Sequence, residues 1–366
     1  MDLRKLVTIR RISSLEPIPN ADNIELARVD GWQIVTQKGW AKPNMLVAFF
    51  EVDSFIPVDP RFEFLRKSGF KSTKHLGDGF RLKTIKLRKT LSQGLIMPLE
   101  DLFELDGLDI TEILNVQKYE KPIPSSLAGK VKGNFPTYIR KSDQERAQNL
   151  GKELQQAIDD KLEFETTLKL DGSSMTVYCW EQKEAIQGEF GIETEFVGVC
   201  SRNWDLDEDK EHKDEKRNAF WDCANKRGLI DAIKVAKEIA GYGLAFQGEL
   251  VGPGVQYNRE NLLDLDFYLY NIWNIDEQRY LSPFERQYLL SYLMERGHTI
   301  NHVPVIDILS LDQFCTSTSL IDGLLKYADR PSLNPEVPAE GIVFKSMTTS
   351  FQFKIINNQF LLGEKD

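Results

Sequence analysis

The stretch from Glu165 to Tyr178 places the strongest constraint on how this chain can fold. Apolar and polar residues alternate as far as Lys169, the turn sequence Asp171-Gly172-Ser173 follows, and a second alternating run begins at Met175. Alternation with a period of two is typical of strands, in which every second side chain points to the same face. The pattern predicts a lysine at the end of a strand, a carboxylate two residues later, and a glycine that lets the backbone approach a ligand closely.

This stretch has two interpretations. Asp171-Gly172 is an ordinary turn signal between the strands of a β-hairpin, and a Lys-x-Asp-Gly match arises by chance in roughly one chain in ten of this length. Alternatively, Lys169 lies in a cleft beside phosphates or a metal ion, where its neutral form is favoured and its amine becomes a nucleophile. The rest of the chain decides between these interpretations.

Composition excludes several classes of protein. The 366 residues suggest two or three domains, and 41% hydrophobic with 10% aromatic residues is typical of a folded chain. No apolar run approaches the ~20 residues of a membrane helix, and the first residues do not resemble a signal peptide. The four cysteines lack a metal-binding spacing, so we expect a reducing, cytoplasmic location. The net charge of −10 argues against a general nucleic-acid coat protein but allows a local basic face.

Residues 1 to about 105 have the pattern of a small all-β unit. Turn signals such as Asp30-Gly31 separate the strand-like runs. Those runs are Val7–Ile12, Ile24–Val29, Trp32–Thr36, Met45–Val52, Arg81–Leu87 and Gly94–Pro98. Five or six short strands within this length predict a barrel of the OB type.

The second half of this unit is basic. Its cations are Arg61, Arg66, Lys67, Lys71, Lys74, Arg81, Lys83, Lys86, Arg88 and Lys89. They could form an ordinary solvated surface, but we favour binding of nucleic-acid phosphates, because phenylalanines interleave with them and could stack on bases. The unit also resembles the OB modules that bind tRNA in some synthetases, through the segments 17–26, 46–52 and 86–94.

Residues 115–140 are punctuated by prolines, glycines and serines, so they are the best candidate for a linker. The sequence Ser142-Asp-Gln-Glu145 then fits a capping box that opens a helix through about Ile158. Arg146 would lie in the first turn of that helix, where the helix dipole disfavours a cation. Arg146 could bind an anionic partner at this position, or it could be an ordinary surface charge.

From Lys161 onward, strand-like and helical patterns alternate. The strand-like runs are Phe196–Cys200, Leu244–Val251, Phe267–Ile275, Glu340–Lys345, Phe351–Ile356 and Phe360–Leu362. Helical patterns extend from Phe220 to Ile239 and over Phe284–Arg296. The nearly continuous charges of Asp205–Arg217 are interpreted as a solvated insertion.

Five separate pieces share one chemistry, since each combines carboxylates, cations or glycines at the end of a strand. They are Lys169-Leu-Asp-Gly-Ser173, Ser201-Arg-Asn203, Gln247-Gly-Glu249-Leu-Val-Gly-Pro-Gly254, Glu340-Gly-Ile-Val-Phe-Lys345 and Phe351-Gln-Phe-Lys354. Their recurrence together is far less probable by chance than any single match. The nucleophile interpretation of Lys169 is therefore favoured.

In this order, the five pieces resemble motifs I, Ia, III, IV and V of the covalent nucleotidyltransferases, which comprise the polynucleotide ligases and mRNA capping enzymes. The order and spacing are most similar to ATP-dependent RNA ligases with an OB domain before the catalytic core. The resemblance implies an α+β fold: an N-terminal OB-type β-barrel, then a mixed α/β, ATP-grasp-like nucleotidyltransferase domain of antiparallel sheets flanked by helices. We expect an OB-type nucleic-acid-binding domain at 1–114, a linker at 115–140 and the adenylyltransferase domain at 141–366.

The resemblance also implies catalytic roles. Lys169 would attack the α-phosphate of ATP and carry AMP as a phosphoramidate. Asp171 and Glu340 would hold hydrated Mg²⁺ or Mn²⁺ near that phosphate. Lys345 and Lys354 would bind the α-phosphate. Crowding by these cations would favour the neutral, nucleophilic form of Lys169 and would stabilise charge on the transferring phosphate.

Further residues are implied for the nucleotide pocket. Glu249 would contact the ribose, Arg202 would lie at the ribose or substrate end, and Arg146 would lie near the outer phosphates. Tyr270 occupies the position of an aromatic residue that stacks on adenine, where relatives usually have Phe. Leu168 precedes the nucleophile where relatives often have glutamate.

The last motif has a single lysine, with Gln352 and Ile356 on either side, where a second lysine is often found. Arg146 or the basic OB domain would then supply the binding of the outer phosphates. This departure does not affect the nucleophile.

The sequence thus predicts an ATP-dependent RNA ligase that joins 3′-OH and 5′-phosphate ends, at nicks in duplexes. We expect RNA, or an RNA/DNA hybrid duplex, as its partner, and a monomer without membrane attachment. A DNA ligase or a capping-type enzyme is the alternative, although both usually place an OB domain after the last motif. A more distant alternative is a non-catalytic RNA-binding protein with a relic nucleotide pocket.

Overall fold

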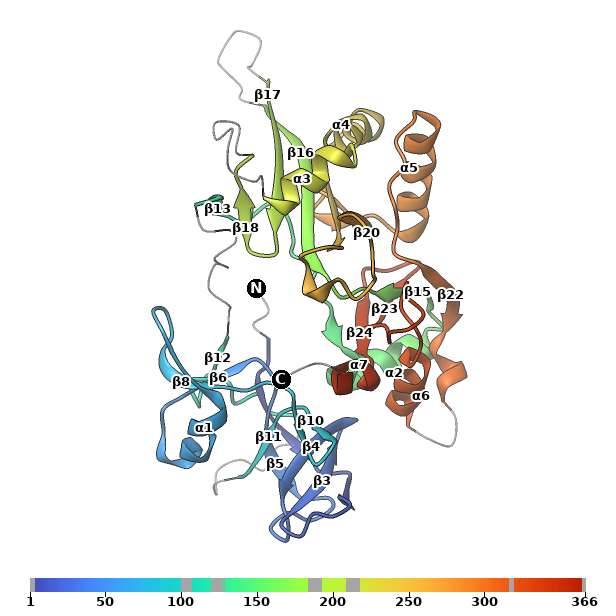
Figure 1. Ribbon diagram of the computed structural model, residues 1–366. Helices are drawn as coiled ribbons and strands as arrows, with labels where there is room; N and C mark the ends of the chain where they lie inside the picture. The colour runs from blue at the N-terminus through green and yellow to red at the C-terminus, as the bar shows by residue number, and fades with distance from the viewer. Residues whose placement is uncertain are drawn as a thin grey trace. The chain divides into compact units, whose positions relative to one another are not determined.

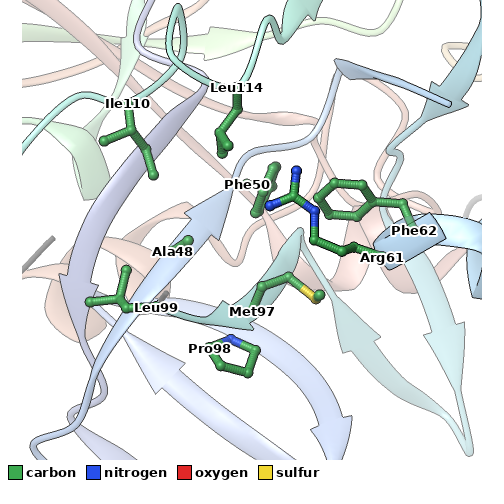
Figure 2. A pocket seen from close by; sticks show the side chains of 9 residues that line it. All are labelled: Ala48, Phe50, Arg61, Phe62, Met97, Pro98, Leu99, Ile110 and Leu114. Atoms are coloured by element: carbon green, nitrogen blue, oxygen red, sulfur yellow. The ribbon is translucent and has the colours of Figure 1, made fainter. Parts of the chain in front are cut away.

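The computed structural model describes residues 4–99, 107–119, 127, 129–183, 193–208, 218–315 and 319–363. The chain divides into two compact units, Met1–Pro122 with Leu361–Asp366, and Ile123–Phe360 (Figure 1). Among the described residues, no helix is both long and apolar enough to span a bilayer.

The first unit consists of short antiparallel strands in four small sheets, with the orders β1-β5-β11, β2-β3-β4, β12-β6-β8-β7 and β10-β9. The strands are β1 (Val7–Arg11), β2 (Ser14–Pro17), β3 (Ile24–Val29), β4 (Trp32–Gln37), β5 (Leu46–Phe50), β6 (Ser54–Pro57), β7 (Phe70–Thr73), β8 (Gly77–Arg81), β9 (Ile85–Leu87), β10 (Thr90–Ser92), β11 (Leu95–Pro98) and β12 (Gln117–Lys118). The short helices η1 (Pro60–Leu65) and α1 (Arg66–Gly69) lie between β6 and β7.

Strand β5 shows why this unit closes around two cores. Val47 and Phe49 pack in one apolar cluster, whereas Ala48 and Phe50 pack in another. Successive side chains of a strand point to opposite faces, so a strand buried on both faces must be apolar throughout. The strand-like run predicted at Arg81–Leu87 is wrong as one strand, because β8 ends at Arg81 and β9 begins at Ile85.

The second unit contains two larger sheets. The seven-stranded sheet has the order β13-β18-β17-β16-β19-β20-β21, and the five-stranded sheet has the order β14-β24-β23-β15-β22. The first comprises β13 (Val131–Asn134), β16 (Ser173–Lys183), β17 (Glu193–Ser201), β18 (Trp204–Leu206), β19 (Leu244–Val251), β20 (Asp266–Asn274) and β21 (Arg279–Tyr280). The second comprises β14 (Glu145–Arg146), β15 (Glu163–Lys169), β22 (Val305–Ser310), β23 (Gly341–Ser346) and β24 (Gln352–Ile356).

Helices flank these sheets, as the predicted α+β class requires (Figure 1). They are α2 (Gly151–Asp159), α3 (Ala219–Lys226), α4 (Leu229–Ala240), α5 (Pro283–Glu295), α6 (Leu320–Ala328) and α7 (Asn358–Gly363), with short turns η3 (Ala147–Asn149), η4 (Gln256–Asn258) and η5 (Leu311–Phe314). Apolar faces of α3 and α4 pack against β16, β19 and β20 in one core, and those of α2 and α6 pack against β15, β23 and β24 in another.

The hairpin interpretation of the Lys169 stretch is wrong. Strand β15 pairs with β22 and β23, whereas β16 pairs with β17 and β19, so the two strands belong to different sheets. Residues 170–172 therefore carry the chain from the five-stranded to the seven-stranded sheet. Lys169 lies at this junction.

The helix predicted from Ser142 is also wrong at its start. Glu145 and Arg146 form β14, which pairs in parallel with Phe353 and Lys354 of β24, and α2 begins only at Gly151. The Glu145 carboxylate accepts hydrogen bonds from the Arg146 backbone N–H and the Asn149 side chain rather than from a helix N-cap. Tertiary strand pairing thus overrides a local capping signal.

Three further expectations need correction or comment. Asp205, predicted to belong to a solvated insertion, is buried in β18, where its carboxylate accepts a hydrogen bond from the Tyr178 hydroxyl. Residues 209–217 of that run lie outside the described residues.

The strand-like end at Phe360–Leu362 is helical, in α7. Residues 115–140 contain β12, which pairs with β6, and β13, which pairs with β18.

Candidate active site

Lys169 is held at the end of β15 by the neighbouring strand. It lies opposite Gly341 of β23, and its ammonium donates a hydrogen bond to Glu340 Oε2 at 2.5 Å. The strand after β23 runs very close, so that a Cβ atom on Gly341 would collide with the Ile355 carbonyl oxygen. Glycine at this position therefore permits the strand packing that brings Glu340 to Lys169.

Two further carboxylates surround this pair. Glu249 lies on β19, opposite Ser174 at the start of β16. Burial and the carboxylates of Glu340 and Asp171 raise the pKa of Glu249 to about 8, and Lys169 lowers it only in part. Three carboxyl groups thus lie around one lysine, and a pKa of about 8 keeps Glu249 largely protonated at neutral pH.

The charge state of Lys169 differs from the sequence expectation. Burial lowers the pKa of Lys169, but Glu340 and Glu249 raise it by more, so that the net pKa lies above the usual value. Glu340 and Glu249 thus outweigh Lys345 and Lys354, the cations that were expected to favour the neutral amine.

Asp171 has a cationic partner that the motifs did not indicate. Arg259, just after η4, places its Nε atom 3.8 Å from Asp171 Oδ2. The glycine that follows Asp171 is needed for close approach, since a Cβ atom on Gly172 would lie 2.7 Å from Glu249 Cγ and would meet the Leu250 carbonyl oxygen.

A second group of cations lies along β14 and β24. Arg146 and Lys354 are neighbours in the parallel pairing of these strands. Asp143 contacts both Lys354, at 3.7 Å, and Arg202 of the segment after β17, at 2.9 Å. Burial lowers the pKa of Lys354 to about 8, with contributions from Lys169 and Arg146.

Tyr270 lies at an irregularity of β20. Asn271 pairs with Gln247 and Leu269 pairs with Gly248, so Tyr270 is an extra residue that bulges from the ladder. Its hydroxyl is 2.8 Å from Ser142 Oγ and 3.3 Å from Ser174 Oγ, and burial raises its pKa to about 12. Bulges often direct a side chain towards a functional site.

Two of the predicted residues make contacts with groups other than Lys169 and its neighbouring acids. Leu168 is buried in the apolar core of the five-stranded sheet, and its backbone N–H donates to the Pro304 carbonyl at 3.0 Å. Lys345 is 3% exposed, and its ammonium donates a hydrogen bond to the Tyr270 carbonyl oxygen. The other predicted residues gather around two foci, the acids near Lys169 and the cations near Lys354.

This arrangement agrees with known proteins. The sequence profile of the RNA ligase family matches residues 162–358, which include the strands that carry Lys169, Glu249, Lys345 and Lys354 but not β14. The chain belongs to the RNA ligase family. An OB-fold domain profile matches residues 6–99, which confirms the predicted N-terminal barrel.

Solved structures of Naegleria gruberi RNA ligase are similar over almost the whole length. A lysine-to-methionine variant with AMP and Mn is 39% identical, covers 98% of each chain and has a TM-score of 0.77. A lysine-to-alanine variant with ATP and Mn gives the same identity, coverage and TM-score, and the enzyme with PPi gives a TM-score of 0.76 at the same identity and coverage. No curated protein matches the sequence significantly.

The donor set of this RNA ligase fits a hydrated divalent cation. Within the described ranges, no group of three or more histidine, cysteine, aspartate or glutamate side chains could hold a metal ion. Burial, and after it the neighbouring carboxyl groups of Glu340 and Asp171, nevertheless raise the pKa of Glu249, so these three acids lie near one another. Oxygen donors and few direct ligands suit Mg²⁺, which usually keeps several of its waters.

Proposed function

We propose that this RNA ligase uses ATP to seal 3′-OH and 5′-phosphate ends, at nicks in duplexes, through an AMP adduct on Lys169. The single observation that supports this most strongly is the position of Lys169 between Glu340 and Glu249, at the junction of two sheets in a chain of the RNA ligase family. The similar ligases solved with ATP, AMP and PPi contain the substrate and products of such a step.

In the first step, Lys169 Nζ attacks the α-phosphorus of ATP, a P–N bond forms, and the bond to the β-phosphate breaks as pyrophosphate leaves. The amine must lose a proton, and Glu340 Oε2 is within hydrogen-bonding distance to accept it. In the second step, AMP passes from Lys169 to the 5′-phosphate of RNA. In the third, the 3′-OH attacks that phosphate and AMP leaves.

Other site residues bind and orient the nucleotide. Tyr270 stacks on adenine, and its hydrogen bonds to two serines fix the ring. Glu249 contacts the ribose, and Lys354 binds the α-phosphate. Arg146 lies beside Lys354 and meets the outer phosphates, which would account for the missing second lysine of the last motif. Arg202 serves the ribose or substrate end.

Asp171 and Glu340 would hold Mg²⁺ or Mn²⁺ through water molecules. When bound, the cation neutralises charge on the transferring phosphate. For the protein, its arrival would offset the carboxylates that raise the pKa of Lys169, which would favour the neutral amine that the attack requires.

We assign the remaining roles to the three segments predicted from the sequence. Residues 1–114 bind RNA, or an RNA/DNA hybrid duplex, residues 141–366 carry out adenylylation, and residues 115–140 join them. The protein acts as a monomer in a reducing, cytoplasmic compartment, in keeping with four cysteines that are all free thiols.

Sealing assays on nicked duplexes test this function. We expect ATP-dependent joining when the 3′-OH end is RNA, and much weaker joining when it is DNA. Equal sealing of all-DNA nicks would favour a DNA ligase. A protein adduct formed from GTP in preference to ATP would favour a capping-type enzyme, and RNA binding without any adduct would favour a non-catalytic protein.

A further inference from the structure

Three charged side chains are buried together next to Tyr270. Glu165 of β15 is 6% exposed, Arg286 of α5 is 3% exposed and Lys345 of β23 is 3% exposed. Burying a charge costs free energy unless it is paired and hydrogen-bonded. Neither Glu165 nor Arg286 belongs to the five motifs, so the group needs a separate explanation.

The pairing within this group is not the one that the strands favour. Glu165 and Lys345 lie directly opposite each other in the antiparallel pair of β15 and β23, where side chains share a face and lie about 5 Å apart at Cβ. Within the described part of the chain, however, no salt bridge joins them. Glu165 Oε2 instead pairs with Arg286 Nη2 at 2.5 Å, and the two side chains are 8% and 4% exposed.

Lys345 has a different partner. Its ammonium donates to the carbonyl oxygen of Tyr270, the residue that bulges out of β20. A bulged residue is left outside the regular ladder, and its buried carbonyl requires another donor. Lys345 supplies that donor, and it links the five-stranded sheet to the seven-stranded sheet at the tyrosine.

We propose that Arg286 is a positioning residue for ATP: by binding Glu165, it leaves Lys345 free to secure the bulge that presents Tyr270 to the adenine ring. This inference rests on the proposed function, in which Tyr270 stacks on adenine. Within the described part of the chain, Arg286 has Glu165 and not Lys169 as its ion-pair partner, so in this proposal it acts through Glu165 and Lys345.

The electrostatics of the neighbouring groups agree with this arrangement. Burial and Arg286 lower the pKa of Lys345 to about 7, and Glu165 raises it only in part. Burial, Arg286 and Lys345 lower the pKa of His302 to about 3, so this histidine is neutral and does not compete for Glu165. Glu165 thus pairs with Arg286, and among the described residues no carboxylate lies within salt-bridge distance of Lys345.

Removal of Arg286 would change the partner of Lys345. The Glu165 carboxylate would remain buried without its cation, and the nearest available cation across the strand pair is Lys345. Capture of Lys345 by Glu165 would release the Tyr270 carbonyl and loosen the bulge. The expected consequence is weaker binding of ATP with little change in the chemistry at Lys169.

Three variants test this inference by the steady-state kinetics of AMP transfer and by thermal melting. We expect Arg286→Met to raise KM for ATP about tenfold while kcat changes much less. The double variant Glu165→Gln/Arg286→Met removes the carboxylate that would capture Lys345 and should return KM close to the wild-type value. Arg286→Lys keeps a cation for Glu165 and serves as the matched control, with KM close to wild type.

A folded Arg286→Met enzyme with unchanged KM would overturn the inference. So would a double variant whose KM is at least as high as that of Arg286→Met, since a merely structural pair would not be rescued by a second loss. If Arg286→Met does not fold, the double variant alone tests the inference. A KM for ATP close to the wild-type value would support it, and a raised KM would overturn it. Absence of an AMP adduct in the wild-type protein would instead overturn the proposed function, and this inference with it.

Discussion

At the scale of single residues, the site is dominated by the imbalance between acids and cations. Glu340 and Glu249 raise the pKa of Lys169, and Asp171 contributes to the raised pKa of Glu249, whereas Lys354 and Arg146 lie along a neighbouring strand pair. The neighbouring carboxyl groups therefore stabilise a protonated Lys169. Adenylylation requires this balance to shift towards positive charge before Lys169 can react.

Lys354 gives a prediction for pH. Because its pKa is lowered to about 8, chiefly by burial, its positive charge is present below that pH and is lost as the pH rises through it. We expect KM for ATP to rise as the pH increases from about 7 to about 9, since the phosphate then loses a cationic partner. The measurement is KM for ATP against pH.

Lys354→Arg is the matched control for that profile, because arginine stays charged over the whole pH range. The KM of this variant for ATP should therefore not rise with pH. A wild-type KM that is flat across this range would contradict the role assigned to Lys354.

Each of the five motifs lies in or beside a strand, namely β15, β17, β19, β23 or β24, so strand geometry positions its side chains. The sequence does not indicate Arg259 or Asp143, whose importance comes from partners far away in the chain. Nor does it indicate that Glu165 pairs with Arg286, since a strand and a helix 121 residues apart carry no shared local pattern. Contacts of this kind depend on tertiary packing.

At the scale of elements, the chain crosses between two sheets just after Lys169. The alternating pattern predicts both β15 and β16, but period alone cannot distinguish a hairpin from a crossing, because both need a turn. The capping signal at Ser142 failed for a related reason, since pairing with β24 outweighs a preference worth about 1 kcal/mol. The strand β19 and the helix α5 were predicted closely, because each forms a continuous pattern bounded by turn or capping signals.

Gly172 tests the crossing. Gly172→Ala should destabilise the protein by about 1–3 kcal/mol and reduce AMP labelling, because the added methyl group would overlap the Leu250 carbonyl and lie 2.7 Å from Glu249 Cγ. Gly151→Ala, in open space at the start of α2, is the control and should leave both quantities nearly unchanged. Equal melting temperatures and labelling for the two variants would show that the crossing is looser than described.

At the scale of the whole molecule, a chain with net charge −10 must bind RNA through a local surface. The basic stretch of the first unit is the candidate, although Arg61 and Arg66 are already paired with Asp59 and Glu63. We therefore propose exposed lysines such as Lys71 and Lys74 as the better phosphate ligands.

Substitution of these lysines tests that surface. Lys71→Ala/Lys74→Ala should weaken RNA binding and reduce the slope of log affinity against log salt by about 1 for each lost phosphate contact. Lys38→Ala, an exposed lysine outside the basic stretch, is the control and should leave the slope unchanged. An unchanged slope in the double variant would exclude this face as the RNA-binding surface.

The central claim is that Lys169 carries AMP. The most direct measurement is peptide mass spectrometry of the protein after incubation with ATP and Mg²⁺ or Mn²⁺, together with radioactive AMP labelling of Lys169→Ala. We expect one AMP adduct on the peptide that contains Lys169 and no label on the variant. Undiminished labelling of Lys169→Ala, or an adduct on a different lysine, would contradict the account.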